Sequence, residues 1–234
     1  GRAAEIVPSL VEETGASAVH WNRCYEPFAI ERDRGIKAAL NAAGVAVESF
    51  GGNLLFEPWT VKTGSGGPYK VFTPFYKTCL RASPPRAPLA APSRLPAPDR
   101  WPASDSLADW DLPPTGPDWA DGLRECWTPG EAGARDRLAD FLDGPVSDYP
   151  TARDHWGEIS PRQVWHAAHA RQEGAGDKGR ESFLREIVWR EFAHNLLYHW
   201  SDLPEAPLRP EFADFPWRRN RDRERAWQEG ATGY

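Results

Sequence analysis

Proline is concentrated in one stretch of this chain and divides the remainder into two parts. Ten prolines lie between Arg81 and Pro117: Pro84, Pro85, Pro88, Pro92, Pro96, Pro98, Pro102, Pro113, Pro114 and Pro117. Each removes a backbone N–H donor and fixes φ, so a run of this density cannot form a helix interior or a central strand. We therefore expect a long linker that runs extended over the surface.

Tryptophans recur along the linker and just beyond it, at Trp101, Trp110, Trp119 and Trp127. A disordered tether rarely carries so many indoles, because such segments lack large apolar side chains. We expect the linker to be pinned against a folded body.

The segment before the linker alternates between helix and strand patterns. Apolar residues recur at helical spacing over 3–14, ahead of the capping residue Gly15, and again from Pro27 to Gly44. Short apolar runs at Ser17 to Trp21 and Val45 to Phe50 predict strands. This alternation is typical of a parallel α/β sheet. Two strands are too few for a stable sheet of that kind, so we expect strands to be missing upstream.

Residues 54–80 carry two further signals. Gly64 to Gly67 could be interpreted as a phosphate loop, but it lacks Walker or dinucleotide spacing, and an ordinary flexible turn is favoured. Thr73 followed by Pro74 is typical of a helix start with a threonine N-cap. Upstream, Trp21-Asn22-Arg23 lies where a strand gives way to a helix, a usual place for ligand contacts.

Helical periodicity returns after the linker. It spans Ala132 to Leu142, and Ser160 followed by Pro161 marks another helix start. In that second helix His166 and His169 lie three residues apart, which invites a metal interpretation. No third ligand is nearby, so a solvated pair is favoured and we expect no metal site.

The longest helical pattern runs from Arg180 to Trp200. Its apolar residues recur at helical spacing and form a wide stripe for burial: Phe183, Leu184, Ile187, Val188, Phe192, Leu196 and Leu197. On another face Glu186, Trp189 and Arg190 fall at i, i+3 and i+4, which places them side by side. A buried helix with an exposed ion pair is the plainer alternative to a binding site.

Composition narrows the class of protein. A net charge of −6 argues against a wholly basic nucleic-acid binder, although a local basic groove is compatible with it. Cys24, Cys79 and Cys126 are odd in number and far apart, which favours a reducing cytoplasm. No membrane span or signal peptide is expected. The absence of methionine and the ending Thr232-Gly233-Tyr234 lead us to expect a fragment of a longer protein.

Several long motifs resemble those of the DNA photolyase and cryptochrome family, of the bacterial deoxyribodipyrimidine photolyase type. They are WNRxYEP, FEPW, GGPYKVFTPF, RWPASDSLADW, GEISPRQVW and ESFLREIVWREF. The resemblance implies an α/β plus all-α fold with three parts. These are part of a Rossmann-like antenna domain at 1–80, an interdomain linker at 81–142, and part of a helical flavin- and DNA-binding domain at 143–234. It also implies FAD, and a folate or deazaflavin as the antenna.

The resemblance implies light-driven repair of cyclobutane pyrimidine dimers in DNA, a carbon–carbon lyase reaction, with UV-damaged DNA as partner to a monomeric protein. Glu186 and Trp189 match the lesion contacts, and Trp217 matches the outer tryptophan of an electron relay. Residues implied at the flavin are Tyr149, Phe183 and Arg190; those implied at DNA are Arg153, Glu186, Trp189 and Arg190. A run of arginines after Trp217 could contact phosphates or form a solvated helix face.

The chain departs from the family pattern between Asp154 and Gly157. Family members carry a segment of the TSxLSxxLxxG type there, whose hydroxyls and amides bind the flavin phosphates. The family residues around the flavin ring and the inner relay tryptophans, which follow TGY in other members, are also absent. We therefore expect weak flavin binding or none. A cryptochrome-like blue-light photoreceptor and a non-functional remnant are the alternatives.

Overall fold

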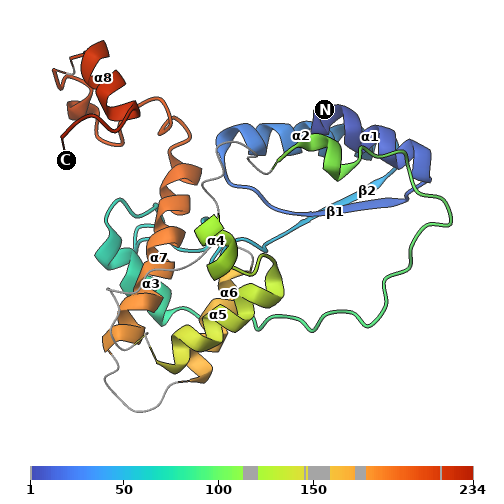
Figure 1. Ribbon diagram of the computed structural model, residues 1–234, viewed down its shortest axis with the longest axis horizontal. Helices are drawn as coiled ribbons and strands as arrows, with labels where there is room; N and C mark the ends of the chain where they lie inside the picture. The colour runs from blue at the N-terminus through green and yellow to red at the C-terminus, as the bar shows by residue number, and fades with distance from the viewer. Residues whose placement is uncertain are drawn as a thin grey trace. The chain divides into compact units, whose positions relative to one another are not determined.

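The computed structural model describes residues 2–112, 121–144, 146, 159–171, 178–216 and 218–233. Contacts divide the chain into two compact units, Gly1–His199 and Trp200–Tyr234. The first unit holds a small α/β layer and a group of helices, and the second holds one short helix (Figure 1). The fold class expected from the sequence, α/β followed by all-α, is confirmed.

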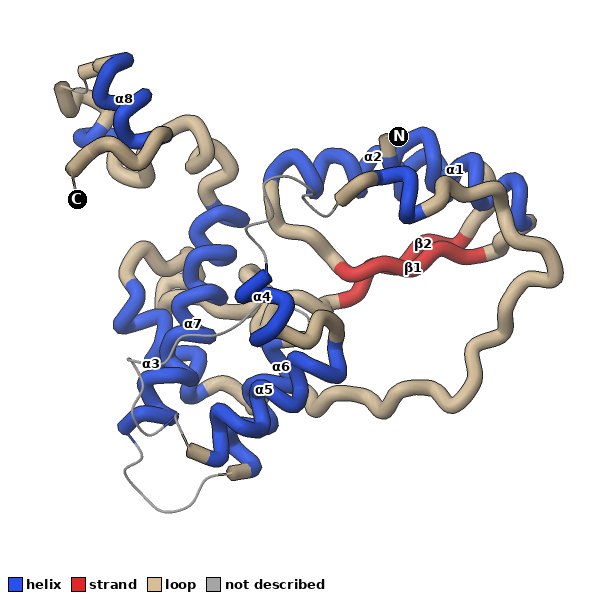
Figure 2. The backbone as a smooth tube through the Cα atoms, viewed as in Figure 1, coloured by secondary structure: helices blue, strands red, loops and turns tan. Residues whose placement is uncertain are grey.

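The α/β layer begins the first unit. Helices α1 (Ala3–Thr14) and α2 (Pro27–Ala42) alternate with strands β1 (Ala18–Asn22) and β2 (Ala46–Phe50). The strands pair in parallel, with Ala18 opposite Ala46 and Asn22 opposite Phe50. Among the described residues they form a sheet of two strands (Figure 2). Both helices pack on the sheet face that carries Val19 and Val47.

Helix α3 (Phe72–Arg81) begins two residues earlier than the sequence indicates. The expected N-cap, Thr73, lies inside the helix, and Val71 takes the capping position without a side-chain hydrogen bond. Pro74 is tolerated because the first four N–H groups of a helix have no partner within it. The prediction of a threonine cap is wrong, and a consequence is that Phe72 becomes helical and turns inward, where it is buried.

Over residues 82–112, the part of the proline-rich stretch that the structure describes, the linker is extended, as expected, apart from the short 3₁₀ turn η1 (Leu107–Trp110). Trp101 and Trp110 are exposed, so the expectation that indoles pin the linker is wrong for these two. The first residues of the linker are instead held by a histidine: the ring Nε2 of His166 lies 2.9 Å from the carbonyl oxygen of Pro85. His166 is therefore half-buried in a contact, not one member of a solvated pair.

Beyond the proline-rich stretch, the described part of the first unit contains α4 (Asp121–Cys126), α5 (Glu131–Asp143), α6 (Pro161–Ala170) and α7 (Lys178–His199). The first two begin within the implied linker at 81–142, which is therefore partly helical. The predicted start of α6 is confirmed, because Ser160 and Gln163 form a reciprocal capping box. One apolar cluster joins α3, α6, α7 and the loop before α3; its buried members are Leu55, Val61, Phe72, Phe75, Cys79, Trp165, Val188 and Phe192.

The second unit contains the 3₁₀ turn η3 (Pro210–Phe212) and helix α8 (Arg221–Gln228). The side chain of Asn220 caps α8 by accepting hydrogen bonds from the backbone N–H groups of Asp222 and Arg223. Residues 218–225 are exposed throughout; Arg218 and Arg219 precede α8, and the remaining arginines of the run lie on it. No described helix in either unit combines the length and apolar character needed to cross a bilayer.

Candidate functional site

The outer face of α7 carries the three side chains that the sequence places side by side. Glu186, Trp189 and Arg190 are all exposed, and the Trp189 side chain retains 43% of its accessible surface. Within the described part of the chain, Glu186 forms no hydrogen bond or ion pair, and its carboxylate is open to solvent. These three residues are called the α7 face below.

One side of the Trp189 indole is covered by α3. Its ring lies parallel to the ring of Phe72, with centroids 3.5 Å apart and planes 8° apart. The edge of Phe192 packs against it at 5.8 Å. Since Phe72 covers one side of the ring, the exposed surface of Trp189 belongs to its other side and its rim.

Arg190 is tied to the loop between β2 and α3. Its Nη1 donates a hydrogen bond to the carbonyl oxygen of Asn53 at 2.6 Å, and lies 3.3 Å from Glu191 Oε1. These contacts use one nitrogen of a guanidinium that has five N–H donors. The remaining donors stay available to an anion at the α7 face.

Glu191 is a site residue that sequence reasoning missed. Its side chain is buried, and Oε2 accepts hydrogen bonds from the backbone N–H groups of Leu55 at 2.8 Å and Phe56 at 3.1 Å. Burial raises the pKa of Glu191 to about 7, against the opposing effect of these N–H donors and of Arg190 and Arg162. The carboxylate therefore binds the loop to α7.

The same loop is held again further along α7. Asn195 Nδ2 donates to the carbonyl oxygen of Pro58, and the His199 ring lies at the same oxygen, each at 3.2 Å. Glu191, Asn195 and His199 are spaced at i, i+4 and i+8, so they form one polar row. This row of polar residues is the sequence signal from which the role of Glu191 could have been predicted. Irregular backbone that is buried against a helix needs hydrogen-bond partners, and such a row supplies them.

The polar residues at the carboxyl ends of the strands are used inside the protein. Arg23 Nη1 lies 2.8 Å from Glu57 Oε1, and the Tyr25 hydroxyl donates to Glu57 Oε2 at 2.8 Å. Burial, together with Glu57, raises the pKa of the Tyr25 phenol. At the place where the sequence predicts ligand contacts, these side chains instead connect the end of β1 to the loop between β2 and α3.

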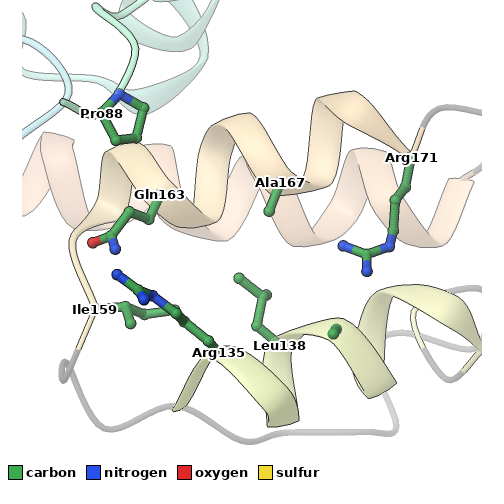
Figure 3. A pocket seen from close by; sticks show the side chains of 8 residues that line it. Pro88, Arg135, Leu138, Ile159, Gln163, Ala167 and Arg171 are labelled. Atoms are coloured by element: carbon green, nitrogen blue, oxygen red, sulfur yellow. The ribbon is translucent and has the colours of Figure 1, made fainter. Parts of the chain in front are cut away.

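A pocket of about 250 Å³ lies between α5, α6 and the start of the linker (Figure 3). Arg135, Gln163 and Arg171 surround it together with apolar side chains. Both arginines already form ion pairs, with Glu131 and Asp143 respectively. Ligand pockets for drug-sized molecules and cofactors usually measure roughly 300–1,000 Å³, so this one suits at most a small molecule.

The residues implied at the flavin are only partly placed. Phe183 is half-buried, and its ring packs edge-on against Phe141 at 5.0 Å in a cluster between α5, α6 and α7. Arg190 is tied to the loop as described, and neither residue lines the pocket. Tyr149, Arg153 and Trp217 lie outside the described residues. No cluster of metal-ligating side chains is found among the described residues.

Comparison with known proteins matches both parts of the chain. A family model described as DNA photolyase covers residues 1–97, and one described as the FAD binding domain of DNA photolyase covers residues 183–234. A deoxyribodipyrimidine photo-lyase of Agrobacterium fabrum is 42% identical across 100% of this chain and 52% of its own length. Cryptochrome-1 of Arabidopsis thaliana is 31% identical across 100% of this chain and 38% of its own.

The fold agrees with the same group. The crystal structure of a bacterial class III photolyase from Agrobacterium tumefaciens superimposes with a TM-score of 0.88 at 42% identity, covering 100% of this chain and 52% of the other. The chain spans about half the length of the photolyases it matches. Two family models, these relatives and this structural match establish that the chain belongs to the DNA photolyase and cryptochrome family.

Proposed function

We propose that this chain supplies the lesion-binding face of a DNA photolyase that acts on cyclobutane pyrimidine dimers. The observation that supports this most directly is the exposure of Glu186 and Trp189 side by side on α7. Tryptophan side chains are largely buried on average, so an exposed indole on a helix that packs in the main core favours a binding role. The higher identity to a photolyase than to a cryptochrome, 42% against 31%, favours repair over signalling.

The chemistry of the α7 face fits an extruded pyrimidine dimer. Enzymes that act on a base rotate it out of the duplex into contact with aromatic and hydrogen-bonding side chains. The free side of the Trp189 ring offers a plane for stacking, which is tolerant of base identity. Glu186 accepts a hydrogen bond from a base N–H when ionised and donates one to a base carbonyl when protonated.

Arg190 completes the face with positive charge. Its guanidinium is held in place by the Asn53 carbonyl and retains donors for a phosphate oxygen beside the lesion. A fixed arginine at this point supplies local positive charge to a chain whose net charge is −6. The contacts to Glu186 and Trp189 then supply selectivity for the lesion, and Arg190 supplies affinity for the backbone.

Residues 183–234 match the model of the family's FAD binding domain, but the described pocket is not a site for FAD. The pocket between α5 and α6 is smaller than a flavin dinucleotide requires, and Phe183 and Arg190 contact protein groups instead. The proposed role of this chain is therefore recognition of the lesion. A monomeric state and a cytoplasmic location remain predictions; the free thiols of Cys24, Cys79 and Cys126 are in keeping with a reducing compartment.

The proposal is tested by binding in darkness. A short single-stranded oligonucleotide with one thymine dimer is titrated with the chain and compared with the undamaged oligonucleotide. The parent chain should prefer the damaged strand, and Trp189→Ala should reduce its affinity by roughly 1–3 kcal/mol. Trp101→Ala removes an indole that is 72% exposed on the linker and serves as the matched control. Equal binding of both oligonucleotides by the parent, or equal loss in both variants, would contradict the proposal.

A further inference from the structure

Trp189 is the exposed end of a stack of three aromatic rings. Tyr76 and Phe72, one turn apart on α3, lie with ring centroids 5.6 Å apart and planes at 22°. Phe72 and Trp189 are closer, at 3.5 Å and 8°. Phe72 is buried between half-buried Tyr76 and Trp189, which is 43% exposed, so Trp189 is the end of the stack that is open to solvent.

Surrounding side chains restrict Phe72 itself. Its ring packs edge-on against Phe192 at 5.8 Å, and Phe192 also contacts Trp189 at 5.8 Å. Helices α3 and α7 pack against each other along this cluster, which belongs to the main apolar core (Figure 1). Phe72 is therefore a fixed plane, whereas an exposed tryptophan without such support would sample several rotamers.

A fixed indole binds a flat partner at lower entropic cost. Immobilising a rotamer-rich side chain at an interface costs affinity, and a ring that is already oriented avoids that cost. The side of Trp189 that faces away from Phe72 can accept one more aromatic plane and lengthen the stack. Offset or parallel arrangements of this kind are favourable for aromatic pairs.

We propose that Phe72 is a positioning residue for DNA recognition: stacked beneath Trp189, it sets the plane of the indole against which an extruded pyrimidine dimer lies. This inference rests on the proposed function. It assigns a role in recognition to a residue of α3, which lies far from α7 in the sequence.

Phe72→Leu tests the proposal, and Phe75→Leu is its matched control. Both substitutions remove one aromatic ring from the same core, and Phe75 contacts Phe192 and Tyr69 but not Trp189. With the dimer-containing oligonucleotide, Phe72→Leu should raise Kd roughly three- to tenfold, the cost of immobilising one side chain. Phe75→Leu should leave Kd within twofold. Equal losses in the two variants, or no loss in Phe72→Leu, would overturn the proposal.

A second measurement reads the indole without DNA. The chain is labelled with 5-fluorotryptophan, and the Trp189 signal among its 12 tryptophans is assigned by its loss in Trp189→Phe. Phe72→Leu should shift this ¹⁹F resonance because the stacked ring current is lost, and Phe75→Leu should leave it in place. If the parent chain shows no preference for the dimer, the proposed function fails, while the ¹⁹F shifts still decide whether Phe72 orients Trp189. An unshifted resonance in Phe72→Leu would refute that orienting role.

Discussion

Glu191 combines burial, which disfavours a negative charge, with contacts that favour one. Its Oε2 accepts two backbone N–H groups from the β2–α3 loop, and Oε1 lies beside Arg190. The charged groups that act on it come from three helices: Arg190 on α7, Arg162 on α6 and, as a weak acid, Cys79 on α3. Burial still dominates, and the pKa of the carboxyl rises from 4.5 to about 7.

Stability should therefore fall as the pH rises between these two values. In that window the folded chain keeps a proton on Glu191 that the unfolded chain has lost, so unfolding releases it and becomes easier at higher pH. The loss of unfolding free energy amounts to at most about 3 kcal/mol by pH 7. Urea unfolding at several pH values measures it.

The variant Glu191→Gln isolates this contribution. Its amide oxygen can still accept the N–H groups of Leu55 and Phe56, but it does not titrate. The difference in unfolding free energy between the parent and Glu191→Gln should change with pH across the window and level off above it. A difference that is constant with pH would show that Glu191 keeps an ordinary pKa.

Residue types and spacing are sufficient to predict the α7 face, but not the buried contacts that hold its side chains in place. Periodicity alone places Glu186, Trp189 and Arg190 together, because three- and four-residue steps share one side of a helix. Glu191 looks like any other helical glutamate in the sequence. Only the fold brings the amides of Leu55 and Phe56 to it, across more than 130 positions.

At the scale of elements, the helix boundaries follow local chemistry where a cap is present. Ser160 and Gln163 mark the start of α6 in the sequence, and the structure confirms it. No side-chain cap marks α3, and Thr73-Pro74 therefore predicts its start two residues too late. The exposed indoles of the linker were also misjudged, since composition does not reveal whether a folded surface lies within reach of Trp101.

Two helical glycines should respond in opposite directions to alanine. A Cβ added at Gly35 in α2 meets no other atom within 4 Å, whereas one added at Gly133 in α5 would lie 2.0 Å from the Thr128 carbonyl oxygen. Gly35→Ala should raise the unfolding free energy by roughly 0.5–1 kcal/mol, the gain in helix propensity. Gly133→Ala gains the same propensity but should lower stability, because backbone must move to relieve the contact.

Urea unfolding of the two variants and the parent measures both changes in unfolding free energy, the expected increase and the expected decrease, in one experiment. Circular dichroism before unfolding provides the control that neither substitution changes the helix content. Stabilisation by Gly133→Ala equal to that by Gly35→Ala would mean that the turn at Thr128 does not pack against α5 as described.

At the scale of the first unit, α6 and α7 hold the β2–α3 loop at successive points. Arg162 donates to the carbonyl of Gly51, Arg190 to that of Asn53, and the row that begins with Glu191 holds the loop as far as Pro58. The loop is therefore a second connection between the α/β layer and the helices, in addition to the linker. Through Arg190 it also fixes one member of the α7 face.

Lesion recognition and flavin binding should be separable in this chain. The α7 face is formed entirely by described residues and needs no cofactor to keep its geometry, because Phe72 and the loop hold Trp189 and Arg190. The pocket of about 250 Å³ is too small for a flavin dinucleotide, and its two arginines are engaged with carboxylates. We expect the purified chain to be colourless and to remain so after incubation with excess FAD and desalting. Absorbance spectroscopy measures this, with a photolyase of full family length reconstituted in parallel as the control. One flavin per chain after desalting would contradict the prediction.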